Sequence, residues 1–145
     1  MKYAYLSAAV LFAGLLLAQC KQPKYTAENL PDEFLRFGSG GGVTGAVTEY
    51  SLYKNGQVFK FAAKAPAPEE VASHGKKKAG QLFETAAALG LFEREFSHPG
   101  NLYYFLEFRN EGKQRRITWG DREHPVDPKI QDLYDQLTQL LPKRK

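Results

Sequence analysis

The dipeptide Asn55-Gly56 most constrains the fold of this chain, because it separates two short segments in which apolar and polar residues alternate. Asn-Gly favours a two-residue turn between antiparallel strands, since both turn positions need a positive φ angle. A strand over residues 46–54 is therefore expected to pair with the segment after Gly56. The register that this turn predicts places Leu52 opposite Phe59, Tyr50 opposite Phe61 and Ser51 opposite Lys60.

A second hairpin is expected from residues 102–109 and 113–119, which alternate in the same way. Two turns remain open for its connection, and each sets a different register. A three-residue turn over 110–112 shifts the pairing by comparison with a two-residue turn at Glu111-Gly112. The two-residue turn pairs Leu106 with Ile117, Tyr104 with Trp119 and Glu107 with Arg116.

Two other segments have the apolar period of a helix. The first covers residues 76–89 and is followed by Gly90, a residue typical of the end of a helix. The second follows Asp127-Pro128, which suits an N-cap and a first helical position, and it runs to about Leu141. The apolar faces consist of Ala79, Leu82, Phe83, Ala86 and Leu89 in the first helix, and of Ile130, Leu133, Tyr134, Leu137 and Leu141 in the second.

These elements predict an α+β fold. A short strand over 33–37 completes the order β-β-β-α-β-β-α, and residues 64–73 are expected to form a loop that contains Pro66 and Pro68. An antiparallel sheet of about five strands with two helices packed on one face buries both apolar helix faces. The glycines at 40, 42 and 45 match G-x-G-x-x-G, but a dinucleotide site needs a helix after this pattern. Because a strand follows instead, residues 38–42 are expected to form a mobile loop or a bulged start of a strand.

The beginning of the chain has the layout of a secretion signal, with Lys2 followed by an apolar run over residues 6–17. This run is too short to span a membrane core, which needs about 20 residues. The sequence Leu17-Ala18-Gln19-Cys20 then resembles the lipobox of bacterial lipoproteins, in which lipid is attached to the cysteine thiol before cleavage on its amino side. Gln19 stands where most lipoboxes have Gly or Ala. The expected organisation is a signal peptide over 1–19, a lipidated cysteine and flexible tether over 20–32, one α+β domain over 33–142 and a basic tail over 143–145.

Lipidation of Cys20 accounts for the single cysteine of the chain, which can form no internal disulfide. The expected membrane partner is thus reached through a lipid anchor. The residues after Cys20 lack the aspartate that retains many lipoproteins in the inner membrane, and they lack an acidic run that directs others to the cell surface. By resemblance to those sorting rules, we expect the protein on the periplasmic side of the outer membrane.

Few residues suggest chemistry. The net charge of +4 comes with only short basic runs, so no nucleic-acid partner is expected. The histidines at 74, 98 and 124 have no metal-ligand spacing, and we expect neither a metal ion nor a cofactor. Residues 119–124 allow two interpretations. Trp119, Asp121 and Arg122 form a recognition surface, or Trp119 packs on Tyr104 while the other two close a loop. Three aromatic residues are also expected off the core face, where they indicate a second binding area: Tyr53, Tyr103 and Phe105.

Several segments are similar to a family of small, uncharacterised bacterial lipoproteins. They are the Gly-rich stretch before Asn55-Gly56, the run 89–92, Pro99-Gly100-Asn101 and the run 117–121. The resemblance spans residues 34–141 and implies fold and localisation, but it carries over no catalytic residue. The expected function is a non-enzymatic, membrane-anchored domain that binds an envelope protein or another envelope component. Two alternatives remain: a hydrolase that uses Asp121, Glu123 and His124, or a carrier with a lipid or small-ligand pocket between sheet and helices.

Overall fold

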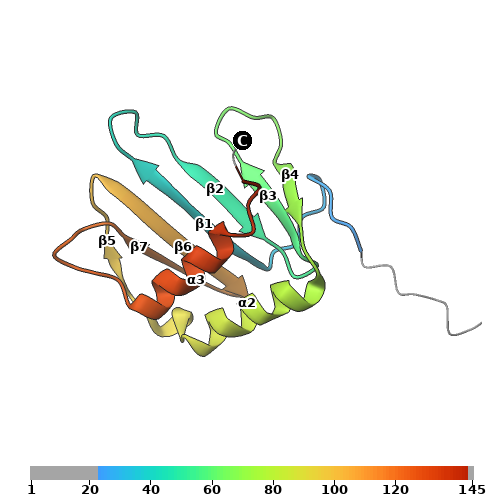
Figure 1. Ribbon diagram of the computed structural model, residues 1–145. Coiled ribbons are helices and arrows are strands. Elements are labelled where there is room, and N and C mark those ends of the chain that lie inside the picture. The colour runs from blue at the N-terminus through green and yellow to red at the C-terminus, as the bar shows by residue number, and fades with distance from the viewer. Residues whose placement is uncertain (1–22, 144–145) are drawn as a thin grey trace, which may run out of the picture.

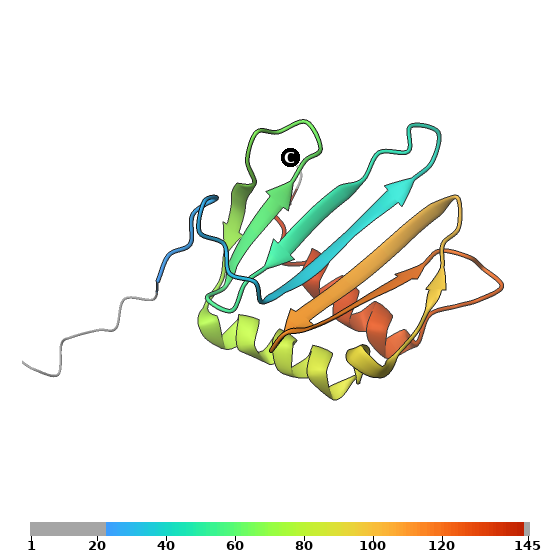
Figure 2. The same cartoon turned by 180° about the vertical axis from the view of Figure 1, so that it is seen from behind.

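The computed structural model of the protein describes residues 23–143, which form one seven-stranded sheet with both helices on the same face (Figures 1 and 2). The strand order is β4-β3-β2-β1-β6-β7-β5, and every neighbouring pair is antiparallel except β5 and β7. The elements are β1 (Phe34–Gly41), β2 (Thr48–Leu52), β3 (Gln57–Phe61), β4 (Glu69–Ser73), α2 (Lys76–Ala88), the short 3-10 helix η1 (Leu91–Glu93), β5 (Ser97–His98), β6 (Leu102–Asn110), β7 (Lys113–Trp119) and α3 (Pro128–Thr138).

The α+β class is therefore confirmed, whereas the expected antiparallel sheet of about five strands is too small and lacks the parallel pair. Strand β4 lies inside the segment 64–73 that was expected to be a loop. It is an edge strand whose residues are partly or fully exposed, so its sequence shows no apolar alternation. Strand β5 has only two residues, which is too short for any periodic pattern.

The first hairpin has a different register from the expected one. Its loop contains three residues, 54–56, because the Gly56 N–H donates to the Tyr53 carbonyl (2.9 Å) and the Tyr53 N–H donates to the Gln57 carbonyl (3.0 Å). Gly56 has a positive φ of 96°, but Asn55 does not, and the Asn55 side chain accepts a hydrogen bond from the Gln57 N–H (3.0 Å). This longer loop shifts the pairing by one residue. The observed pairs are Leu52 with Val58, Ser51 with Phe59, Tyr50 with Lys60 and Glu49 with Phe61.

The second hairpin has the two-residue turn, since Glu111 and Gly112 both have positive φ angles (50° and 75°). Its register agrees with the corresponding prediction. The observed pairs include Leu106 with Ile117, Tyr104 with Trp119 and Glu107 with Arg116.

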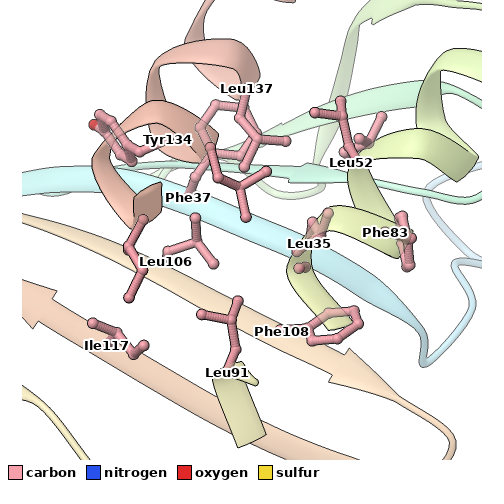
Figure 3. Close-up of a cluster of buried hydrophobic side chains, with 14 of the residues drawn as sticks. Leu35, Phe37, Leu52, Phe83, Leu91, Leu106, Phe108, Ile117, Tyr134 and Leu137 are labelled. Atoms are coloured by element: carbon pink, nitrogen blue, oxygen red, sulfur yellow. The ribbon is translucent and has the colours of Figure 1, made fainter. Parts of the chain in front are cut away.

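Both helices bury the faces that their apolar period predicts. Helix α2 is followed by Gly90 in the left-handed region (φ 62°), and the Asp127 side chain caps α3 by accepting the Lys129 N–H (2.9 Å). The helix side chains meet one face of the sheet in the main core, where Leu35 and Phe37 of β1 lie beside Phe108 and Leu106 of β6 (Figure 3). The buried helix residues are Ala79, Leu82, Phe83, Ala86, Ile130, Leu133, Tyr134 and Leu137.

Strand β1 continues to Gly41, so most of the expected Gly-rich loop is regular strand. The glycines leave room for aromatic rings of β6 on the sheet face opposite the helices. A Cβ atom on Gly38 would lie 2.8 Å from the Phe105 ring, and one on Gly40 would lie 2.6 Å from the Tyr103 ring. The Gly-x-Gly pattern thus serves packing between neighbouring strands.

Residues 23–32 lie against the sheet, which differs from the flexible tether that their composition predicts. Tyr25 and Leu30 pack on a small second core formed by Phe34, Tyr53 and Phe59. The expected signal peptide and Cys20 lie outside the described residues. Among the helices of the described part of the chain, none is long and apolar enough to cross a membrane.

Candidate functional site

A cluster of His98, Asp121 and His124, which we call the histidine cluster, lies beside the edge of the sheet formed by β5. The Asp121 carboxylate contacts the His124 ring, with Oδ2 2.7 Å from Nδ1. The rings of His98 and His124 are stacked, with centroids 4.2 Å apart and an angle of 11° between their planes. One potential ligand atom from each of the three residues can be chosen so that all lie within 4.8 Å of one another. The structure therefore assembles two imidazoles and one carboxylate from three separate positions of the chain.

The backbone around two glycines brings these side chains together. The Asp121 N–H donates to the His98 carbonyl (3.0 Å), which joins β5 to the end of β7. A Cβ atom on Gly100 would lie 2.5 Å from the Gly120 carbonyl oxygen, and one on Gly120 would lie 2.3 Å from the Leu102 carbonyl oxygen. The two segments can approach this closely only because both positions are glycine. The Pro99-Gly100 and Trp119-Gly120 pairs were the signal in the sequence that could have pointed to this approach.

The cluster is open to solvent, and its carboxylate is ionised at neutral pH. The Asp121 and His124 side chains are 35% and 51% exposed. The hydrogen bond with His124 lowers the pKa of Asp121, and a second hydrogen bond from the Glu123 N–H (3.0 Å) acts in the same direction. A carboxylate that holds one nitrogen of an imidazole also orients the ring and leaves its other nitrogen free for a ligand or a proton.

Of the six residues expected on the recognition surface and the second binding area, three are buried, namely Trp119, Phe105 and Tyr53. Trp119 is only 5% exposed, and its Nε1 donates to the Gln131 Oε1 of α3 (2.9 Å), in line with the packing interpretation. Phe105 is fully buried beneath the Arg116 guanidinium, which lies 3.7 Å from the ring centroid. Tyr103 is half-buried over Gly40, and Tyr53 is 2% exposed under Tyr25. Of this set, Arg122 is exposed and Asp121 belongs to the histidine cluster.

The two alternative functions find limited support. Asp121 and His124 are in contact, as a hydrolase would need, but the hydrogen bond recorded for Glu123 comes from its backbone. The surface cavities around α2 and β2–β4 are not lined by Asp121, Glu123 or His124. A carrier would need apolar space beneath the helices, where the main core instead consists of buried, contacting side chains.

A second feature lies at the other end of the sheet, where the first described residues meet the β2–β3 hairpin. The Asn55 Nδ2 donates to the Pro23 carbonyl (2.9 Å). The Tyr25 N–H donates to the Gln57 Oε1 (2.7 Å), and the Gln57 Nε2 donates to the Tyr25 carbonyl (3.2 Å). Asn55 and Gln57 are 9% and 3% exposed, so both amides are almost fully used inside the protein. Sequence reasoning assigned Asn55 only to the turn and missed that it holds the preceding segment.

Lysines gather around this end. Lys24 pairs with Glu70 of β4 (3.5 Å), and Lys54 pairs with Glu33 (2.7 Å). Lys54 and Lys76 also line one cavity of about 300 Å³ beside Phe83. The first turn of α2 adds Lys77 and Lys78, both exposed. We call Lys24, Lys54, Lys76, Lys77 and Lys78 the lysine cluster.

No family model matches this chain, and no curated protein matches it.

Proposed function

We propose that this protein is a lipid-anchored envelope protein whose domain lies directly against the membrane and binds an envelope partner without catalysis. The lipid is attached to Cys20, in the sequence Leu17-Ala18-Gln19-Cys20. Its location is the periplasmic side of the outer membrane, in keeping with the residues that follow the cysteine. The observation that carries the membrane contact is the hydrogen bond that holds Pro23 on Asn55.

The distance between lipid and domain supports this contact. Pro23 follows Cys20 by three residues. A fully extended chain spans at most about 3.5 Å per residue, so Pro23 lies within about 10 Å of the lipidated residue. A domain held this closely has little freedom to move away from the headgroups. In both views the first described residues lie beside β4 and close to the start of α2, so this side of the domain faces the membrane (Figures 1 and 2).

The lysine cluster supplies the charge that suits this position. Among residues 23–143, Lys76, Lys77 and Lys78 make no ion pair with a carboxylate. Their place in the first turn of α2 is unfavourable within the protein, because the N-terminal end of a helix is itself partly positive. Anionic headgroups compensate such lysines, each by about 1 kcal/mol near a charged membrane surface.

Incorporation of labelled palmitate tests the anchor. The wild-type chain expressed in a bacterial host should carry the label and fractionate with membranes, whereas Cys20→Ser should lose the label. Gln19→Ala, which restores a more usual lipobox, is the matched control and should keep it. A wild-type chain without label would overturn the proposal, because the attachment that brings the domain to the membrane would be absent.

A further inference from the structure

We propose that His98, Asp121 and His124 bind a divalent transition metal ion such as Zn²⁺. Two imidazole nitrogens and a carboxylate oxygen are a ligand set that Zn²⁺ accepts, with water in the remaining position. The proposal rests on the histidine cluster alone and is independent of the lipid anchor. The histidine cluster lies far from the lysine cluster. Strand β7 ends at Trp119, beside the histidine cluster, and begins at Lys113, at the end of the sheet next to the proposed anchor.

The distances allow a metal ion after small side-chain movements. The three donor atoms lie within 4.8 Å of one another. Around a tetrahedral zinc ion with bonds of about 2.1 Å, donor atoms are about 3.4 Å apart. The required shift of roughly 1 Å is within the reach of rotations about the side-chain bonds, and His124 has room to rotate because its side chain is 51% exposed.

The stacking of the rings defines what must change on binding. Each nitrogen lone pair lies in the plane of its own ring, and two nearly parallel planes do not meet at a point between the stacked rings. One ring must therefore turn before both nitrogens can face the same ion. His98 is in β5 and contacts the Phe96 ring edge-on at 4.8 Å, so the ring of His124 is the one expected to turn.

Asp121 has two ways to serve the site. It can ligate the metal directly, or it can keep its hydrogen bond with Nδ1 of His124 while Nε2 of that ring ligates. The second arrangement is the carboxylate–histidine–metal pattern that is common in metalloproteins. Both require Asp121, and both use the backbone hydrogen bond that already joins Asp121 to His98.

The contacts within the cluster give little reason for it as a stabilising element. An exposed ion pair contributes about 0 to 1 kcal/mol to folding. The Asp121 and His124 side chains are both more than one-third exposed, and neither residue belongs to either of the two cores. A pair of stacked imidazoles beside a carboxylate is thus better explained by a ligand than by packing.

Isothermal titration with Zn²⁺ tests the proposal on the full chain carrying Cys20→Ser, in detergent, so that the only thiol does not compete for the metal. We expect saturable binding of one ion per chain. His98→Asn, His124→Asn and Asp121→Asn should each weaken it at least about tenfold. His74→Asn is the matched control, because His74 is the remaining histidine and its Nε2 contacts the Leu140 carbonyl (2.8 Å). Its affinity should equal that of the parent chain.

A second measurement avoids substitutions that could impair folding. In the unsubstituted cluster, one equivalent of paramagnetic Ni²⁺ should broaden the NMR signals of the His98 and His124 rings before those of His74. Absence of saturable Zn²⁺ binding would overturn the proposal. So would a His98→Asn variant that binds Zn²⁺ as tightly as the His74→Asn control. Equal broadening of all three histidines would also overturn it.

Discussion

At the residue scale, Tyr134 shows how one polar atom is fitted into an apolar core. Its hydroxyl donates to the Gly38 carbonyl (3.1 Å), and its ring packs edge-on against Trp119 (centroids 5.2 Å apart). The residue is 8% exposed. Burial, followed by the nearby Tyr104, raises the pKa of Tyr134 to about 12. The neutral phenol is therefore favoured in the folded state far more than in the unfolded chain.

This raised pKa predicts an alkaline loss of stability. Because the folded pKa exceeds the unfolded value of about 10, the stabilisation is complete below that pH and is lost as the pH rises towards about 12. Tyr134→Phe should lower the free energy of unfolding by about 1 kcal/mol at neutral pH, since it removes one hydrogen bond. It should also reduce the additional loss between about pH 10 and 12.

Urea unfolding followed by circular dichroism at neutral and alkaline pH measures both effects. Burial raises the pKa of Tyr53 as well, so the variant should keep part of the alkaline loss. Tyr103→Phe, which alters a half-buried tyrosine on the opposite sheet face, is the control and should follow the parent curve. Parallel curves for Tyr134→Phe and the parent over the alkaline range would contradict the role of this hydroxyl.

At the element scale, α2 combines a well-formed apolar face with an unfavourable beginning. Gly75 at its N-cap supplies no side-chain acceptor, and its first turn contains no acidic residue. The lysines at 76–78 instead place positive charge at the positive end of the helix dipole. Natural sequences tolerate such local conflicts mainly where function requires them. The membrane surface proposed for this end of the domain is a reason of that kind.

We therefore expect Lys77→Glu to stabilise the isolated protein. The charge reversal should raise the free energy of unfolding by about 0.5 to 1 kcal/mol at low ionic strength, because it replaces an unfavourable interaction with the helix dipole by a favourable one. Lys77→Gln should give about half of this gain, and high salt should reduce both. Thermal unfolding of the Cys20→Ser chain in detergent is the measurement. A lower melting temperature for Lys77→Glu would show that the lysine is compensated within the protein itself.

The elements also show which parts of the fold a sequence can predict. Both helices and the second hairpin follow from periodicity and turn chemistry, as the pairing of Leu106 with Ile117 confirms. The predicted register of the first hairpin is wrong because Asn-Gly fits two loops of different length. The Asn55 side chain stabilises the longer loop through its hydrogen bonds to Gln57 and Pro23. Those contacts are 2 and 32 residues away, so no local pattern contains the second. The edge strands β4 and β5 show no alternation of apolar and polar residues. They are strands because of their pairing with neighbouring strands, and this pairing cannot be read from a sequence period.

At the scale of the whole molecule, the sheet separates two ends with different chemistry. One end has Phe34 opposite Arg109, next to the segment that leads to Cys20 and to the lysine cluster. The other end has Gly41 opposite Leu102, beside the loops that hold the histidine cluster. The proposed anchor therefore leaves the proposed metal site facing away from the membrane, where ions and envelope partners have access.

The histidine cluster could not be predicted from spacing. His98 and Asp121 are brought together by the parallel pairing of two-residue β5 with β7, and His124 then reaches back from the loop before α3. Each step depends on tertiary structure. The anchor is the opposite case, because its evidence is a contiguous motif that ends at Cys20.

The orientation of the domain gives the last prediction. In the lipidated protein on vesicles of phosphatidylethanolamine and phosphatidylglycerol, an introduced cysteine is the only free thiol, because the chain has one native cysteine. A fluorophore on Ser73→Cys, which shares a surface cavity with Pro23, should be quenched by headgroup-labelled lipid. A fluorophore on Val43→Cys should not be quenched, since Val43 is fully exposed beyond the far end of β1, an eight-residue strand of about 26 Å.

Replacing phosphatidylglycerol by a neutral lipid should weaken the quenching at position 73, because the lysine cluster then lacks its anionic partner. Equal quenching at both positions would mean that the domain tumbles on its anchor, and the hydrogen bond between Asn55 and Pro23 would then not determine its orientation.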